Sequence, residues 1–162
     1  TSVSVPASVV EIGEYAFHGC DELMGINVAE GNSKYVSVDG VLFDKGMTTL
    51  LKYPEASFVT DYTIPEGVDY IATGAFRNSG VTNVVIPASV KKIGYGAFEM
   101  CESLRNLVLP NSVSVIEPGA FEGCLALKVT FKNSVYGKNS GDYYDSTKDM
   151  SELYYDINTS IF

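Results

Sequence analysis

The sequence predicts a β-rich α/β solenoid of stacked repeats, and three observations lead to this fold class. The chain has 162 residues, of which 46% are hydrophobic, which is enough for one core of ordinary size. A pattern with a period of 22–23 residues recurs along the chain. Each copy adjoins a short stretch of alternating apolar residues that ends at a proline, which is typical of a β-strand that stops at a turn.

Each copy contains a proline, an isoleucine six residues later and an Ala-Phe pair four residues after that. The recurring residues are Pro6, Pro65, Pro87 and Pro110; Ile12, Ile71, Ile93 and Ile116; and Phe17, Phe76, Phe98 and Phe121. A period of about 20–29 residues with leucine-like positions before a short strand predicts a leucine-rich repeat solenoid with parallel strands. Because stacked units share one core, we expect the phenylalanines to form one ladder and the isoleucines another.

A glycine precedes three of the four Ala-Phe pairs. These residues are Gly74, Gly96 and Gly119, and Tyr15 takes the position in the first copy. Glycine tolerates a positive φ, so we expect a tight corner there. The Ala-Phe-x-x-Cys segment that follows is expected to form a single helical or 3₁₀ turn, because it is too short for a full helix.

An insert interrupts the repeats, because Pro6 and Pro65 are 59 residues apart instead of one period. Subtracting one period leaves an insert of about 37 residues, near 28–62. Alternating apolar stretches predict a β-meander there, with Asp39-Gly40 as a two-residue hairpin turn. The expected strands are 36–38, 41–43 and 50–53. We expect the meander to extend the sheet of the solenoid, so that residues 1–131 form one domain.

The pattern I-P-x-S-V-x-x-I-G-x-x-A-F-x-x-C-x-x-L, read over residues 86–104, resembles BspA-like leucine-rich repeat proteins. The insert, with Asn32-Ser33-Lys34-Tyr35, Asp39-Gly40-Val41-Leu42-Phe43 and Tyr53-Pro54, is similar to a hairpin module that interrupts arrays in that family. The resemblance covers about residues 1–131. It implies a secreted or surface-anchored protein of bacteria or host-associated microbial eukaryotes, with binding to host matrix proteins or other cells as its activity.

Residues 132–162 do not repeat the pattern. The polar segment 132–145 is expected to be a loop. Ser146-Thr147-Lys148-Asp149 resembles a capping box, and apolar residues at helical spacing follow it. We therefore expect an amphipathic helix over 147–157 that covers the open end of the core. The alternative is a linker that is ordered only in a longer parent chain.

Composition disfavours several classes of function. The 11 Lys and Arg residues against 20 Asp and Glu give a net charge of −9, which repels the phosphates of nucleic acids. No apolar stretch reaches the length of a membrane span. The single histidine, His18, occupies a variable repeat position and is expected to be exposed. No catalytic, cofactor or metal site is predicted, and the acidic residues near the C-terminus lack the order of a calcium loop.

The three cysteines, Cys20, Cys101 and Cys124, fall at one repeat position, where Ser79 stands in the remaining copy. The main interpretation is a ladder of buried thiols that act as small apolar residues. A disulfide between Cys101 and Cys124 remains open, because neighbouring strands lie within the distance that a disulfide spans.

The remaining candidate is a surface. Side chains alternate along each strand, so Leu107 and Leu109 should point into the core and their neighbours outward. The expected outward residues are Asn27, Asn83, Val85, Asn106, Val108, Lys128 and Thr130. A curved solenoid turns such residues into an extended binding face.

The leading hypothesis is a non-enzymatic module of a microbial surface or secreted protein that binds a host or microbial surface protein or a glycan. The alternative is a structural spacer that presents another domain of a longer parent chain. The two differ in whether the outward residues contact a partner.

Overall fold

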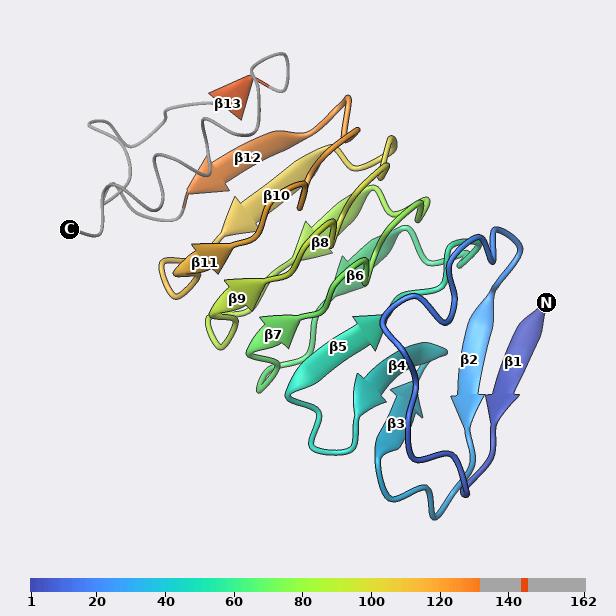
Figure 1. Cartoon of the computed structure of the whole chain (residues 1–162). Helices are drawn as coiled ribbons and strands as arrows, with labels where there is room; N and C mark the ends of the chain where they lie inside the picture. Colours follow the sequence, from blue (N-terminus) through green and yellow to red (C-terminus); the bar gives the residue numbers. More distant parts are fainter. Residues whose placement is uncertain (132–143, 146–162) are drawn as a thin grey trace.

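The computed structural model describes residues 1–131 and 144–145, which wind into a solenoid with strands stacked along its length (Figure 1). The chain begins with β1 (Ser2–Val5) and β2 (Gly25–Val28), which pair in parallel as a separate two-stranded sheet. The remaining strands form two larger sheets.

The five-stranded sheet contains the strands that precede the prolines of the repeats. In spatial order they are β13 (Tyr144–Asp145), β12 (Lys128–Phe131), β10 (Asn106–Leu109), β8 (Asn83–Val85) and β6 (Asp61–Thr63). From β6 to β12 the pairing is parallel, as the sequence predicts. β13 pairs antiparallel with β12, although the sequence predicts a loop there. This pairing covers the otherwise open edge of β12.

The six-stranded sheet combines the inserted meander with the short strands of the repeats. In spatial order it contains β11 (Val115–Ile116), β9 (Lys92–Ile93), β7 (Tyr70–Ile71), β5 (Thr49–Lys52), β4 (Val41–Asp44) and β3 (Tyr35–Val38). The pairs β3–β4 and β4–β5 are antiparallel, whereas β5 pairs in parallel with β7. The meander therefore extends the sheet of the solenoid, as expected from the sequence.

The predicted turns have the backbone conformations that their residues indicate. Asp39 and Gly40 have φ values of 50° and 79°, and both must be positive in a type I′ hairpin turn. Gly74, Gly96 and Gly119 have φ values of 61°, 56° and 68° before the Ala-Phe pairs. The predicted corner is thus confirmed in the three repeats that follow the insert.

Three of the predicted phenylalanines form a stacked ladder. The ring centroids of Phe76 and Phe98 are 4.7 Å apart and those of Phe98 and Phe121 are 5.3 Å apart. The planes of neighbouring rings differ by 10° and 12°. All three rings are buried, so they form the centre of the core that the repeats share.

The first repeat does not join this ladder, which corrects the prediction for Phe17 and Ile12. Tyr53 from the insert stacks on Phe76 instead, with ring centroids 4.9 Å apart. Leu50 similarly takes the place of Ile12 and lies opposite the next isoleucine in the sheet. The physical reason is that the meander lies between the first repeat and the others and presents its own side chains to them.

The first repeat packs in a second, smaller core. We call residues 1–33 the N-terminal unit and residues 53–131 the array. Val5, Leu23, Ile26 and Leu42 are the buried members of the small core, and Phe17 and Ile12 are only partly buried against them. Phe43, which follows Leu42 in β4, is buried in the large core instead. One strand of the meander therefore contributes to both cores. The helix predicted over 147–157 lies outside the described residues.

Candidate functional site

The outward-facing residues of the five-stranded sheet form two rows in register. In the first row, Asn106 lies opposite Asn83 on one side and Lys128 on the other. In the second row, Val108 lies opposite Val85. Asn83 is partly buried and the other four are exposed, with exposed fractions of 56% for Val85 and 42% for Val108.

Thr130 and Asn27, the other two residues of the predicted face, lie in different sheets. Thr130 is in backbone register with Val108, so it continues the second row. Asn27 is exposed, but it lies in the two-stranded sheet, opposite Ser4, and not in register with Asn83. The structure thus brings six of the seven predicted residues together on one sheet and leaves Asn27 apart.

The side chains between the outward residues point into the core. Val84, Leu107 and Val129 lie opposite one another across β8, β10 and β12, and all three are buried. This alternation follows from the pleat of a strand and explains why sequence spacing predicts the exposed side of this sheet.

Asp61 belongs to the first row, although the sequence analysis did not identify it. It lies opposite Asn83 in β6, and the Asn83 side-chain amide donates a hydrogen bond to its carboxylate. The Asn106 Nδ2 group donates in turn to Asn83 Oδ1 at 3.2 Å. Asp61 precedes Asn83 by 22 residues, so the repeat spacing contained the signal. The three side chains form a polar ladder across three strands.

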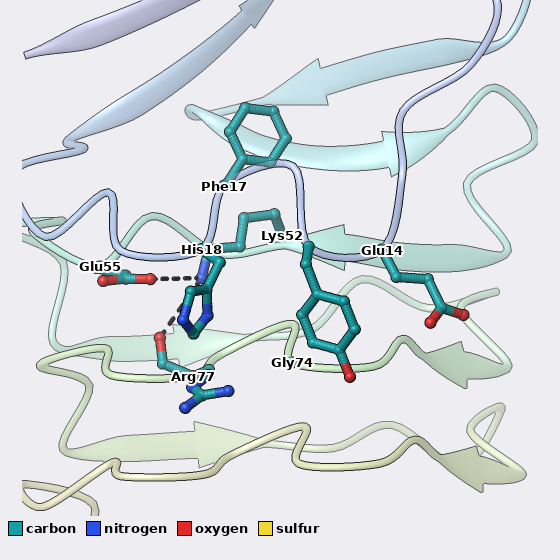
Figure 2. A pocket seen from close by; sticks show the side chains of 8 residues that line it. Glu14, Phe17, His18, Lys52, Glu55, Gly74 and Arg77 are labelled. Carbon is teal, nitrogen blue, oxygen red and sulfur yellow. Dashed lines mark hydrogen bonds and ion pairs between the residues drawn. The ribbon is translucent and has the colours of Figure 1, made fainter.

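A small cavity lies where the N-terminal unit meets the array (Figure 2). Its volume is about 20 Å³, which admits about one water molecule and no larger ligand. The lining residues are Glu14, Tyr15, Phe17, His18, Lys52, Glu55, Gly74 and Arg77. His18 is exposed at the surface, as predicted from its variable repeat position.

A buried ion pair adjoins this cavity. Lys52 Nζ lies 3.0 Å from Glu55 Oε1, and both residues are buried. Figure 2 shows the same ammonium group donating to the Arg77 carbonyl oxygen, at 3.4 Å. Within the described residues, Glu55 Oε2 and Arg77 Nε are buried without a hydrogen-bond partner. The pair joins the end of β5 to the first turn of the next repeat, which indicates a structural role.

A second ion pair joins two repeats on the six-stranded sheet. Lys92 Nζ is 2.8 Å from Glu117 Oε1 and 5.0 Å from the centre of the Tyr70 ring. The hydrogen bond to Glu117 raises the pKa of Lys92, and the same bond lowers the pKa of Glu117. Both side chains are partly exposed, so this contact is expected to be weak.

The three cysteines are free thiols, so the open bridge between Cys101 and Cys124 is not formed. Cys101 Sγ donates to the Phe76 carbonyl oxygen at 3.0 Å, and Cys124 Sγ donates to that of Phe98 at 2.9 Å. Interaction with Cys101 and burial raise the pKa of the Cys124 thiol. The predicted ladder of buried thiols is thus confirmed for Cys101 and Cys124 but not for Cys20, which is only partly buried and packs against the small core of the first repeat. The sequence did not predict that the two buried thiols donate to backbone carbonyl oxygens of the phenylalanine ladder.

Metal centres and membrane-spanning helices have no candidate within the described residues. Across 1–131 and 144–145, no three His, Cys, Asp or Glu side chains are arranged to hold a metal ion. The same residues include no helix with the length and apolar character needed to cross a membrane.

The repeat pattern of this chain is also found in a known protein family. A protein-family model described as a BspA type leucine rich repeat region matches the chain in six copies, over residues 1–49 and 52–159. No curated protein matches the chain.

Solved structures of bacterial proteins are also similar. A leucine-rich repeat protein from Eubacterium ventriosum is 29% identical, with a TM-score of 0.78 over 85% of this chain and 36% of that one. The pneumococcal vaccine antigen PcpA is 28% identical, with a TM-score of 0.70 over 83% of this chain and 40% of the antigen. A leucine-rich cell surface protein from Faecalibacterium prausnitzii, 23% identical with a TM-score of 0.52, shares the fold over 88% of this chain and 52% of that chain. The chain therefore spans well under half the length of the first two proteins.

Proposed function

Because the chain belongs to the BspA-type leucine-rich repeat family, we propose that it is a non-enzymatic module that binds a partner protein. The module would be part of a bacterial surface or secreted protein. The likeness to a vaccine antigen supports such a location, because antibodies must reach an antigen of this kind.

The outward rows of the five-stranded sheet carry the proposal. Val85 and Val108 are exposed side by side in register, and the polar row of Asn83 and Asn106 runs alongside them. Apolar side chains at the centre with polar groups around them are typical of protein–protein interfaces. Repeat stacking extends this surface over several strands, which gives a partner a large and shallow contact area.

The second candidate is a structural spacer, and one observation favours it. The amides of Asn83 and Asn106 bond within the ladder that begins at Asp61, so part of the polar row is already satisfied within the protein. In a spacer this ladder would serve only to hold neighbouring strands together.

The two candidates differ in their response to bulky charges on the face. We would coat purified host extracellular-matrix proteins on plates and measure binding of the chain, of an Asn83→Arg/Asn106→Arg variant and of Asn111→Arg. Asn111 is an exposed turn residue outside the rows and serves as the matched control. Equilibrium unfolding would establish that each variant remains folded.

The proposal predicts that at least one matrix protein binds and that the double variant loses about tenfold or more in affinity, because it places two bulky charges beside the apolar centre of the interface. The control should bind normally. Equal binding by the double variant would favour the spacer. Binding to a glycan array, with no matrix protein bound, would assign the face to sugars instead.

A further inference from the structure

The loop between β5 and β6 displays two neighbouring apolar side chains, of which Val59 stands at a repeat position that other units bury. Phe58 is 84% exposed and Val59 is 49% exposed. Val59 stands two residues before its strand, as do Leu23, Val81 and Leu104 in their units. Those three residues are at most 5% exposed. This unit therefore presents to solvent a position that the others bury.

Hydrogen bonds hold the loop in this conformation. The hydroxyl group of Tyr53 donates to the Val59 carbonyl oxygen and lies 3.2 Å from the Ser57 hydroxyl. The Val59 amide donates to the same Ser57 hydroxyl at 3.2 Å. At the other end of the loop, the Ala56 amide donates to the Leu23 carbonyl oxygen at 2.9 Å. The backbone that carries the exposed ring is therefore fixed, so the loop would lose little conformational entropy when a partner binds.

The surroundings of the loop are acidic. Residues 1–33 contain five carboxylates and no lysine or arginine, and residues 56–76 add three exposed acidic residues, Asp61, Glu66 and Asp69, and again no lysine or arginine. The carboxylates of the N-terminal unit are all exposed and belong to Glu11, Glu14, Asp21, Glu22 and Glu30. The hydrogen bond between Ala56 and Leu23 places the loop against this unit, near Asp21 and Glu22. Figure 1 shows the two segments side by side.

The loop also continues the proposed binding face. Asp61 begins β6 three residues after Phe58 and is the first member of the polar ladder. An apolar anchor therefore lies at one end of the outward rows, within a region that repels anionic ligands and attracts cationic ones.

We propose that Phe58 and Val59 form the apolar anchor of this face and that they dock a basic segment of a partner protein carrying an aromatic or aliphatic side chain. The inference rests on the proposed function and adds the chemistry of the partner to it. Aromatic residues at such positions commonly dominate the energy of an interface.

The test uses a random peptide library displayed on phage, selected against the whole chain. Selected peptides are synthesised and titrated against the unaltered chain, Phe58→Ser and a Val85→Lys/Val108→Lys variant. Leu125→Ser is the matched control, because Leu125 is an exposed apolar residue at the opposite end of the array. Circular dichroism and unfolding curves establish that each variant is folded.

We expect the selected peptides to be basic and to contain an apolar residue. Their affinity should fall about thirtyfold on Phe58→Ser, weaken as salt rises and stay unchanged on Leu125→Ser. Peptides that bind Phe58→Ser as well as the unaltered chain, or that carry no net positive charge, would overturn the inference.

The two proposals can fail separately. Loss of binding on the valine variant without loss on Phe58→Ser would keep the sheet face and remove the anchor. Loss on Phe58→Ser alone would keep the anchor and remove the sheet face. Dimerisation of the chain in sedimentation, abolished by Phe58→Ser, would identify a second copy as the occupant and overturn the basic partner.

Discussion

The N-terminal unit and the array carry the same sequence pattern but are packed differently. In the array, Phe98 lies between two parallel rings and is buried completely. Its counterpart Phe17 is partly buried in a core with only four buried members. The meander separates the two regions, because β4 sends Leu42 into one core and Phe43 into the other.

This difference shows that burial in a solenoid is set by the neighbouring units as well as by the motif. A repeat with a repeat on both sides buries both faces of its ring, whereas the N-terminal unit has the meander on one side. The array should therefore be the more stable region, and the N-terminal unit should open at a lower free energy.

The largest expected effect comes from removing one ring in each region. Phe98→Ala should lower the free energy of unfolding by about 3–5 kcal/mol, because the cavity would lie between two buried rings. Phe17→Ala should cost clearly less, because that ring is already partly exposed. Denaturant unfolding of both variants measures the difference. Equal losses would contradict the distinction between the two cores.

A somewhat smaller effect is expected at the boundary between the regions. Glu55→Ala should lower stability by about 3 kcal/mol, because it leaves the Lys52 ammonium buried without its carboxylate. Replacing both residues by apolar ones, as in Lys52→Met/Glu55→Leu, should restore much of the loss. If Glu55→Ala is as stable as the original chain, the ion pair of Lys52 and Glu55 does not stabilise the contact between the two regions.

The thiols give a third comparison. Cys101→Ala should cost about 1 kcal/mol, because the Phe76 carbonyl oxygen would lose one of its two donors and keep only the Ser79 amide. Cys101→Ser should cost less, because Ser79 occupies the same position in the preceding unit and is also buried. Cys20→Ala tests the N-terminal unit, where the thiol is only partly buried and the loss should be smaller still. Thermal unfolding ranks the three, and a larger loss for Cys20 would reverse the argument.

The smallest effect concerns pH. Lys92 lowers the pKa of Glu117, so this carboxylate stabilises the fold above its unfolded value of about 4.3. The contribution disappears as pH falls through the lower folded value. Glu117→Gln should therefore reduce stability at neutral pH by less than about 1 kcal/mol and have no effect in strong acid. Unfolding curves across this range check the sign, and a loss that grows as pH falls would contradict it.

Much of the fold could be predicted because each repeated residue has one physical task. The proline spacing, the positive φ of Gly74 and the hairpin turn all follow from local chemistry. The motif alone could not predict which aromatic rings stack on one another, because the stacking depends on which segments become neighbours once the insert is present. Tyr53 precedes Phe76 by 23 residues, so the period itself contained the signal that the Ala-Phe motif obscured.

The candidate site was predictable in part for the same reason. Alternation along β8 and β10 identifies Val85 and Val108 as outward residues. The exposure of Phe58 could not be predicted, because the repeat motif contains no counterpart of the Tyr53 hydroxyl group. This hydroxyl group contacts Ser57 and Val59 and so holds the loop that carries Phe58.

Hydrogen exchange at two matched amides tests the central claim most directly. Ile26 in the N-terminal unit and Ile64 in the array are both fully buried. The Ile26 amide donates to the Gly40 carbonyl oxygen at 2.9 Å, and the Ile64 amide donates to that of Val85 at 3.0 Å. If the two cores open separately, Ile26 will exchange at a lower free energy than Ile64, which will exchange only with global unfolding. Equal protection at both amides would show that the chain opens as one unit and would contradict the division into two cores.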